Sequence, residues 1–272
     1  MQKIFYKPKD FWFGDCMPFY KDGTFYLFHQ RDTRNPKPLT DPFGWSLVTT
    51  TDFVKFEEYG EVIHRGGNDD IDQYIYAGSI VKGINEYLAL YTGHNRKAKL
   101  DGKTSEVLMI ASSKDLIHWK KDGEAAKLVP QEGYDKNDWR DPFAIFDQDH
   151  GKYVLILGAR KPASKKKPTG RLVYFESEDL KDWNFKGDYW ANNEFNMIEM
   201  PDIFEIDGTW YLLFSEYCED KKTKYRVGAG LFSDWKSPVD EAFDGKAYYA
   251  ARTVGTNETG RFLTGWVATK DG

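Results

Sequence analysis

Short runs of apolar and aromatic residues, separated by turn residues, make up most of the chain. The first two runs lie at 15–20 and 24–28 and are joined by the turn Lys21-Asp22-Gly23. Short apolar runs between Gly, Asn and Asp residues are typical of β-strands joined by tight turns. No stretch has the periodicity of an amphipathic helix of ordinary length. The pattern predicts an all-β fold.

The unit of strand, turn and strand recurs with a period near sixty residues. Its copies begin at Asp15, Ala77, Asp141 and Asp202, in steps of 62, 64 and 61 residues. A second marker, in which an Asp precedes an apolar or aromatic residue, follows the copies at Asp52, Asp115, Asp179 and, less regularly, Asp234. Two markers that keep one period indicate a repeat architecture.

Each full unit has room for about four short strands, which is the content of one propeller blade. A partial fifth unit ends in the hairpin-like segment 260–267. Because such units bury their faces only against their neighbours, we expect a five-bladed β-propeller with a central axial pocket. No linker divides the chain, so residues 1–272 are predicted to form a single domain.

Composition agrees with this prediction and excludes several classes of function. Aromatic residues make up 17% of the chain and Gly occurs 24 times, which suits pleated strands and tight turns. The formal net charge of -5 and the isoelectric point near 5.6 leave no basic surface for nucleic acid. The mean hydropathy is -0.66, and no apolar run is long enough to span a membrane. We expect a neutral or weakly charged small-molecule partner.

Cysteine and histidine usage predicts neither a disulfide framework nor a metal centre. Cys16 and Cys218 lack metal-ligand spacing and are interpreted as free thiols, which favours a reducing compartment. The first residues lack the apolar run of a signal peptide, so a cytoplasmic location is predicted. The five histidines are scattered, and no metal or other cofactor is expected. The lysine run 165–167 indicates a solvated hairpin loop.

Three acidic residues lie at or near the starts of the repeated units: Asp15, Asp141 and, three residues before Asp202, Glu199. The innermost strand of a propeller blade faces the channel, so these carboxylates are expected to converge on one axial pocket. One such Asp alone would more often cap a strand or a turn. Three together raise one another's pKa values, which proteins tolerate mainly where chemistry requires it. They are the candidate catalytic residues.

The neighbours of the three acids indicate different roles. Arg140 precedes Asp141 and is expected to keep it ionised. Apolar neighbours of Glu199 are expected to raise its pKa, as suits a general acid. Aromatic residues near Asp15, Trp12 among them, suit the apolar face of a sugar ring. One ionised and one protonated carboxyl group is the arrangement that glycoside hydrolysis requires.

These residues also resemble glycoside hydrolase family 32, the invertase and fructanase group, along nearly the whole chain. The family motifs W-M-N-D-P-N-G, L-F-Y-Q, W-G-H-A-x-S-x-D-L, F-S-G-S, Y-T-G-H, F-R-D-P, E-C-P-D-L-F and I-G-W are similar, in this order, to 12–18, 27–30, 45–53, 76–79, 91–94, 139–142, 199–204 and 264–266. Each motif is weak alone, whereas the full series in the right order is a specific signature.

The resemblance implies a retaining double displacement on a β-fructofuranoside, with no cofactor. Asp15 would be the nucleophile, Glu199 the general acid and base, and Asp141 the residue that stabilises the transition state. The positions that would bind the sugar by this resemblance are Gln30, Trp45, Ser79 and Arg140. Asp202 could contact ligand or have a structural role, and His94 could line the pocket.

Two departures from the family pattern bear on the substrate and the domain organisation. Gly14 stands where the family has the Asn before its nucleophile, and Cys16-Met17-Pro18 replaces Pro-Asn-Gly. A side chain that contacts the sugar in the family is therefore missing, so the sequence leaves open a substrate other than sucrose or plain fructan. The C-terminal β-sandwich that family members usually carry is not part of the 272 residues.

Two alternatives remain from the sequence. Glycoside hydrolase family 43 shares the propeller and an acidic trio but inverts at arabinosides or xylosides, and the carboxylate separation distinguishes the two mechanisms. The second alternative is a carbohydrate-binding propeller without catalysis, which the altered surroundings of Asp15 favour. The retention of all three acids favours an enzyme.

Overall fold

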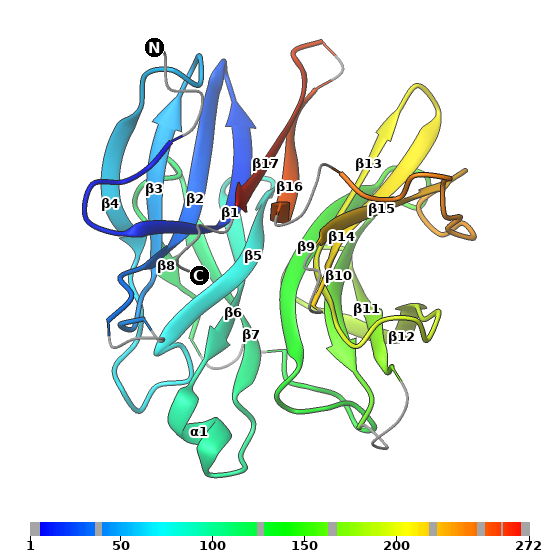
Figure 1. Ribbon diagram of the computed structural model, residues 1–272, viewed down its shortest axis with the longest axis horizontal. Coiled ribbons are helices and arrows are strands. Elements are labelled where there is room, and N and C mark those ends of the chain that lie inside the picture. The colour runs from blue at the N-terminus through cyan, green and yellow to red at the C-terminus, as the bar shows by residue number, and fades with distance from the viewer. Residues whose placement is uncertain are drawn as a thin grey trace.

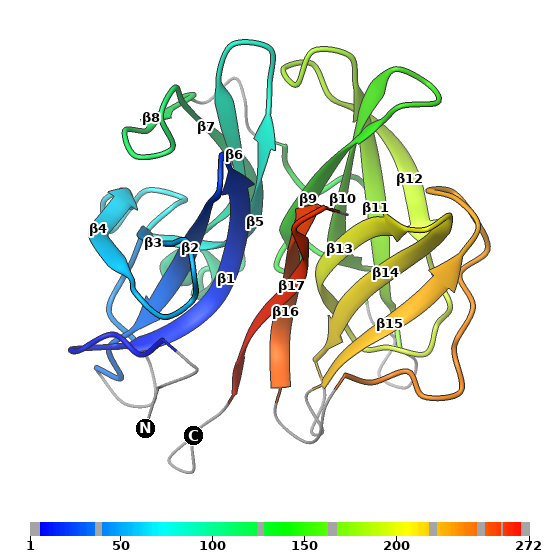
Figure 2. The same cartoon turned by 90° about the horizontal axis from the view of Figure 1, so that it is seen from above.

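The computed structural model describes residues 6–35, 40–123, 128–162, 168–217, 222–243, 248–256 and 258–267. These residues form antiparallel sheets arranged around an axis, so the prediction of an all-β propeller is confirmed. Figures 1 and 2 show the first two sheets on one side, the third and fourth on the other, and the hairpin β16–β17 between β1 and β13. Cys218 and the lysine run 165–167 lie outside the described residues.

The first two sheets have four strands each, in chain order from the innermost strand outwards. The first holds β1 (Trp12–Lys21), β2 (Thr24–Asp32), β3 (Trp45–Thr50) and β4 (Glu57–Ile63). The second holds β5 (Tyr74–Lys82), β6 (Tyr87–His94), β7 (Glu106–Ser113) and β8 (Lys120–Lys121), and the helix α1 (Arg96–Leu100) lies between β6 and β7.

The remaining sheets decrease in size along the chain. The third holds β9 (Trp139–Asp147), β10 (Lys152–Arg160), β11 (Gly170–Ser177) and β12 (Asn184–Trp190). The fourth holds β13 (Ile198–Ile206), β14 (Thr209–Glu216) and β15 (Lys222–Gly228), and the last is the two-stranded pair β16 (Tyr248–Thr256) and β17 (Gly260–Val267). The prediction of five blades therefore holds for only four sheets of three or more strands. A short hairpin takes the remaining place.

Tight turns set the register of the predicted hairpins. Asp22 and Gly23 both have positive φ, at 49° and 83°, and Lys21 pairs with Thr24 across the turn. Asp207 and Gly208 repeat this geometry between β13 and β14, with φ of 50° and 80°. Two consecutive residues with positive φ form the turn that matches the natural twist of a hairpin. These two Asp-Gly pairs therefore mark where the first and fourth sheets turn from their first strand to their second.

The second repeat marker is a hydrogen-bonded turn after the third strand of the first three sheets. In the second sheet, Ser113 Oγ accepts from Leu116 N at 2.9 Å, and Asp115 Oδ1 accepts from Ile117 N and His118 N at 2.9 and 2.8 Å. The same contacts recur at Thr50 with Asp52 and at Ser177 with Asp179. Ser233, which follows the last strand of the fourth sheet, accepts a hydrogen bond from Ala229 N instead, in agreement with its irregular spacing.

Hydrophobic clusters fill the spaces between neighbouring sheets. The first two sheets enclose a cluster around Trp45, the second and third one around Trp139, and the third and fourth one around Phe214. A fourth cluster joins the first sheet to Val254 of β16. The innermost strands contact one another in the order β1, β5, β9, β13, β16 and back to β1, which closes the ring. Within the described ranges, no helix is long and apolar enough to cross a membrane.

Candidate active site

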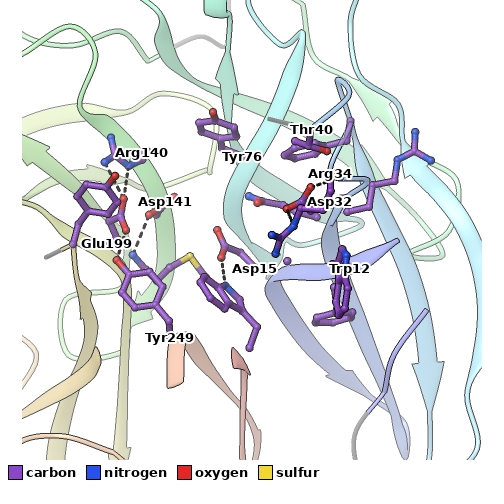
Figure 3. Close-up of a pocket in the computed structure, with 18 of the residues that line it drawn as sticks. Trp12, Asp15, Asp32, Arg34, Thr40, Tyr76, Arg140, Asp141, Glu199 and Tyr249 are labelled. Carbon is purple, nitrogen blue, oxygen red and sulfur yellow. Dashed lines mark hydrogen bonds and ion pairs between the residues drawn. The ribbon is translucent and has the colours of Figure 1, made fainter. Parts of the chain in front are cut away.

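A pocket of about 360 Å³ opens where the innermost strands converge. All three candidate acids, Asp15, Asp141 and Glu199, line it, and Figure 3 shows Asp141 and Glu199 on the side opposite Asp15. Residues from each of the five innermost strands contribute to its wall. The predicted convergence of the acids on one axial pocket is therefore what the structure contains.

Each innermost strand is irregular at the level of this pocket. In β1, β9, β13 and β16, two consecutive residues of the inner strand lie opposite a single residue of the partner strand, which is a β-bulge. In β5, one residue, Ala77, has no residue paired with it in the register with β6. The residues just before these bulges, one per strand, all line the pocket: Phe13, Tyr76, Arg140, Glu199 and Tyr249. A β-bulge redirects side chains and bends the strand, so this ring of bulges shapes the inner wall of the pocket.

The bulges correct the alignment that the sequence repeat suggested. Glu199 lies just before its bulge, Asp141 is the first bulged residue, and Asp15 is the second. The three acids therefore do not occupy equivalent positions of the repeat. Because each acid takes a different position relative to the bulge of its strand, the three carboxylates have different surroundings.

Asp15 is held by the C-terminal hairpin. Trp266 Nε1 donates a hydrogen bond to Asp15 Oδ1 at 2.7 Å, between residues at opposite ends of the chain. Burial raises the pKa of Asp15 to about 6, although the Trp266 hydrogen bond acts in the opposite direction. The group is a carboxylate at neutral pH, with one oxygen fixed by Trp266, and this is the state that a nucleophile needs.

Asp141 has a strained backbone and a buried carboxyl group. Its φ is 62°, in the left-handed region, and Met200 N donates to its Oδ2 at 3.1 Å. Burial and the nearby charge of Glu199 raise the pKa of Asp141, and Arg140 only partly offsets them. The expectation that Arg140 keeps Asp141 ionised is wrong, because the guanidinium forms its hydrogen bonds and ion pairs with other carboxylates.

Glu199 is the acid that Arg140 binds. Arg140 donates from Nε and Nη2 to Glu199 Oε1 at 3.0 and 2.9 Å, and Tyr249 donates its hydroxyl to Glu199 Oε2. Figure 3 shows both contacts on one wall of the pocket. The expectation of apolar surroundings for Glu199 is therefore wrong. Its side chain is oriented by two polar partners.

Arg140 is itself shared among several acids. Its Nη1 donates to Glu106 Oε2 at 3.1 Å and to Asp138 Oδ1 at 2.9 Å, while its other nitrogens bind Glu199. Glu106 is buried and also accepts from Trp139 N at 2.7 Å. Arg140 lines the pocket, as predicted for a sugar-binding residue, but most of its donors serve to fix Glu199.

The other predicted sugar-binding residues divide into two groups. Trp12 and Gln30 line the pocket. Trp45 and Ser79 do not line it: Trp45 is 0% exposed and donates from Nε1 to Tyr76 O at 3.0 Å, and Ser79 Oγ accepts from Ala144 N at 3.1 Å. Both side chains instead support β5 and its neighbours from within the wall.

Two residues with open roles are structural. His94 is buried and stacks on Tyr76 with ring centroids 4.5 Å apart, so it supports the pocket wall without lining it. Asp202 is buried and accepts a hydrogen bond from Thr253 N, which ties β13 to β16. Cys16 is a buried free thiol.

Several pocket residues were not identified from the sequence. Tyr76 and Tyr249 lie at bulge positions that the sequence does not reveal, because Tyr is common throughout the chain. Arg31, Arg34 and Arg96 also line the pocket and come from the ends of β2, the following loop and α1. A long-range contact such as that between Trp266 and Asp15 has no local signal.

A propeller with three carboxylates in its axial pocket, one fixed by Trp and one by Arg and Tyr, has the groups that glycoside hydrolysis requires. Residues 6–272 match the family described as "Glycosyl hydrolases family 32 N-terminal domain", and the chain belongs to this family. The resemblance drawn from the motifs is thereby confirmed.

Relatives of known name support this assignment. The chain is 26% identical to the sucrose-6-phosphate hydrolase of Escherichia coli over 278 residues, covering 94% of this chain and 53% of the relative. The structure of sucrose-6-phosphate hydrolase from Lactobacillus gasseri is similar with a TM-score of 0.77 at 24% identity, over 95% of this chain and 54% of that chain.

A Bombyx mori family 32 β-fructofuranosidase, solved as a mutant in complex with sucrose, gives a TM-score of 0.78 at 22% identity. That match covers 97% of this chain and 57% of the Bombyx chain. At these identities the two structures show that the fold is shared. The chain spans about half the length of the relatives that it matches.

Proposed function

We propose that the chain is the catalytic propeller of a retaining glycoside hydrolase that acts on β-fructofuranosides. The observation that carries the proposal is the shared pocket of Asp15 and Glu199, with the first held by Trp266 and the second by Arg140 and Tyr249. Membership of family 32 and the names of the relatives support the same activity. The substrate partner would be a small carbohydrate.

In the first step, a carboxylate oxygen of Asp15 attacks the anomeric carbon of the fructosyl group. The glycosidic C–O bond breaks, and the leaving oxygen takes the proton of Glu199. In the second step, Glu199 removes a proton from water, and the water oxygen forms a bond to the anomeric carbon while the bond to Asp15 breaks. Asp15 returns as a carboxylate and Glu199 as an acid.

The surrounding residues would stabilise these two steps. Asp141 lies beside the reacting centre, and its carboxyl group can accept hydrogen bonds from ring hydroxyls as positive charge develops on the sugar. Trp12 offers an aromatic face and Gln30 an amide at the wall of the pocket. Arg140 and Tyr249 keep Glu199 in one orientation, so the proton is delivered from a fixed position.

The fructosyl group is common to the candidate substrates, and the leaving group is the part that differs among them. Arg31, Arg34 and Arg96 line the pocket and add positive charge to its wall. A phosphate on the leaving sugar would find complementary charge there, and relatives of this chain are sucrose-6-phosphate hydrolases by name. Sucrose 6-phosphate is therefore our second candidate substrate beside unphosphorylated fructosides.

We also propose that the hairpin β16–β17 is the incomplete fifth blade of the propeller. It contacts both β1 and β13, and it supplies Tyr249 and Trp266 to the pocket. Residues 1–272 would then act as a single catalytic domain, because every group in the proposed mechanism comes from this propeller.

The test is a hydrolysis assay with sucrose, sucrose 6-phosphate, a levan and aryl arabinosides and xylosides. We expect release of fructose, and a loss of at least about a thousandfold in kcat for Asp15→Asn and for Glu199→Gln. Asp149→Asn, in an exposed loop outside the pocket, is the matched control and should retain activity. Nuclear magnetic resonance of the first-formed anomer distinguishes retention from inversion.

Three results would contradict the proposal. Turnover of arabinosides or xylosides with inversion would favour the family 43 type of reaction. Binding of sugars without turnover by the wild type would favour a carbohydrate-binding propeller. Full activity of Asp15→Asn would remove the nucleophile from the mechanism.

A further inference from the structure

A buried arginine lies next to the catalytic acids and has no part in the mechanism described above. Arg252 of β16 is 2% exposed and is one of the largest fully buried side chains of the described residues. It directly follows the bulge of β16, at the position that Cys16, Phe143 and Asp202 occupy on the other inner strands. Arg252 is thus the first paired residue beyond the bulge, three residues along β16 from the pocket residue Tyr249.

The guanidinium of Arg252 supports the backbone of a catalytic residue. Its Nη2 donates to the carbonyl oxygen of Asp141 at 3.0 Å, and its Cζ lies 5.5 Å from the centre of the Phe143 ring. Asp141 has φ of 62°, a conformation that costs free energy for a residue other than Gly unless its surroundings hold it. The bond from Arg252 is a contact that holds it.

The charge of Arg252 has no dedicated ion-pair partner among the described residues. Its Nε and Nη1 have no hydrogen-bond partner in this part of the chain, and Asp202, the nearest candidate by charge, is bound to Thr253 N. Burying a cation without a paired carboxylate destabilises the folded state by several kcal/mol, on the order of the desolvation penalty of a buried ion. Such a cost is retained mainly at functional sites.

The groups that Arg252 faces are those of the active site. Asp202, Asp141, Asp15 and Cys16 interact with it electrostatically, and the charged groups facing Asp15 are Glu199, Arg252 and Arg140. Arg252 lowers the pKa values of both Asp15 and Asp141, against the larger effect of burial. Because Arg140 is already shared among Glu106, Asp138 and Glu199, Arg252 is the second cation available to the two aspartates.

We propose that Arg252 is a positioning residue that acts through Asp15 and Asp141. It holds the left-handed turn that directs Asp141 into the pocket, and its positive charge favours the ionised form of the two aspartates against the effect of burial. The inference rests on the proposed glycosidase function and assigns a role that belongs to neither the nucleophile nor the acid.

The experiment compares Arg252→Gln and Arg252→Lys with the wild type in the pH dependence of kcat/KM for the best fructoside. Arg252→Gln keeps a donor for Asp141 O but removes the charge, so the acid limb should move to higher pH by about half a unit to one unit. Arg252→Lys keeps the charge, so the limb should stay within about 0.2 units of the wild type while kcat falls at every pH. An unchanged acid limb in Arg252→Gln overturns the inference.

Arg226→Gln is the matched control. Arg226 of β15 is equally buried, but it pairs with Glu241 at 2.7 Å and is not among the residues that line the pocket. Its replacement should lower the melting temperature without moving the acid limb. A limb shift of the same size in Arg226→Gln would mean that the effect is not specific to Arg252.

A second variant covers the case in which Arg252→Gln does not fold. The double variant Arg252→Gln with Asp202→Asn also removes the buried carboxylate that interacts electrostatically with Arg252, and its acid limb should shift in the same direction. An inactive wild type would overturn the proposed function and the inference together. An active wild type with an unshifted double variant would overturn the role of Arg252 alone.

Discussion

Burial and hydrogen bonding have opposite effects on the pKa values of single carboxyl groups in this protein, and either effect can be the larger one. Burial raises the pKa of Asp15 to about 6, since one bond from Trp266 does not compensate for the loss of water. Burial also acts to raise the pKa of Asp115, but the hydrogen bonds from His118 and Ile117 outweigh it and hold the pKa below its usual value. The first carboxyl is costly to the fold and is our proposed nucleophile, whereas the second stabilises a turn.

Asp15→Asn should therefore stabilise the protein while it removes activity. A raised pKa in the folded state means that ionisation of Asp15 opposes folding, so the cost is absent below about pH 4 and complete above about pH 6. We expect the free energy of unfolding of Asp15→Asn to exceed that of the wild type by about 1–3 kcal/mol at pH 7. The two should coincide near pH 3.5, as measured by urea unfolding. A constant difference at both pH values would contradict this cause.

Tyr249→Phe tests the orientation of Glu199. Burial and the charge of Glu199 raise the pKa of the Tyr249 hydroxyl, so it stays a donor throughout the working range. A hydrogen bond to a charged group contributes about 1.5–3 kcal/mol, so kcat/KM should fall about 10- to 100-fold, mainly in kcat. Tyr211→Phe, which removes a hydroxyl outside the pocket, is the control. Loss of activity through KM alone would indicate substrate binding instead of positioning.

At the scale of elements, two repeated devices build the propeller: the turn after the third strand and the bulge in the first. The turn uses a Ser or Thr, an Asp and a residue with positive φ, seen at Phe53, Leu116 and Leu180 with φ of 56°, 69° and 64°. The polar contacts of the turn are local, so its Asp could be recognised in the sequence as a repeated marker. The bulge depends on pairing with a neighbouring strand, and no local sequence pattern predicted it.

Asp115→Ala should destabilise the second sheet. The change removes acceptors for Ile117 N and His118 N, and the melting temperature should fall by about 2–4 °C at pH 7. Because the pKa of Asp115 is depressed in the folded state, its contribution is present above about pH 4 and is lost as the pH falls further. Calorimetry at pH 7 and pH 3 checks both statements. Lys114→Ala, an exposed neighbour in the same turn, should change little at either pH.

At the scale of the whole molecule, the active site depends on closure of the ring. Asp15 lies near the start of the chain and Trp266 near its described end, yet the two side chains share a hydrogen bond of 2.7 Å. The hairpin β16–β17, which lies beside β1 in Figure 2, carries Trp266, Tyr249 and Arg252. Folding of the last strands is thus coupled to the assembly of the pocket.

Trp266→Phe should move the acid limb of the pH profile upwards. The change removes the hydrogen bond that lowers the pKa of Asp15, so the pKa should rise above about 6. For a rise of about half a unit to one unit, we expect kcat/KM to decrease about three- to tenfold more at pH 5 than at pH 8. A measured pH profile for hydrolysis of the best fructoside tests this. Trp210→Phe, outside the pocket, should leave the profile unchanged.

The sequence alone determined the class of fold and indicated the three acids that line the pocket. Strand runs, turn residues such as Asp22-Gly23 and the repeated Asp marker are local, so their patterns predicted an all-β propeller and the regions where the inner strands begin. The order of short motifs predicted the family, which the match over 6–272 confirmed. The roles proposed for Trp12 and Gln30 remain predictions, although both residues line the pocket.

The tertiary structure decided what surrounds each acid. Bulges shift the register by one residue, and in the folded chain Arg140 binds Glu199 and not its neighbour Asp141. Trp45 and Ser79 lie within the wall. Pairing between distant strands also brought Trp266, Tyr249 and Arg252 to the acids. A pKa depends on burial and on charges contributed by several strands. The sequence therefore named the carboxylates, and only the closed ring of strands could assign their protonation and their partners.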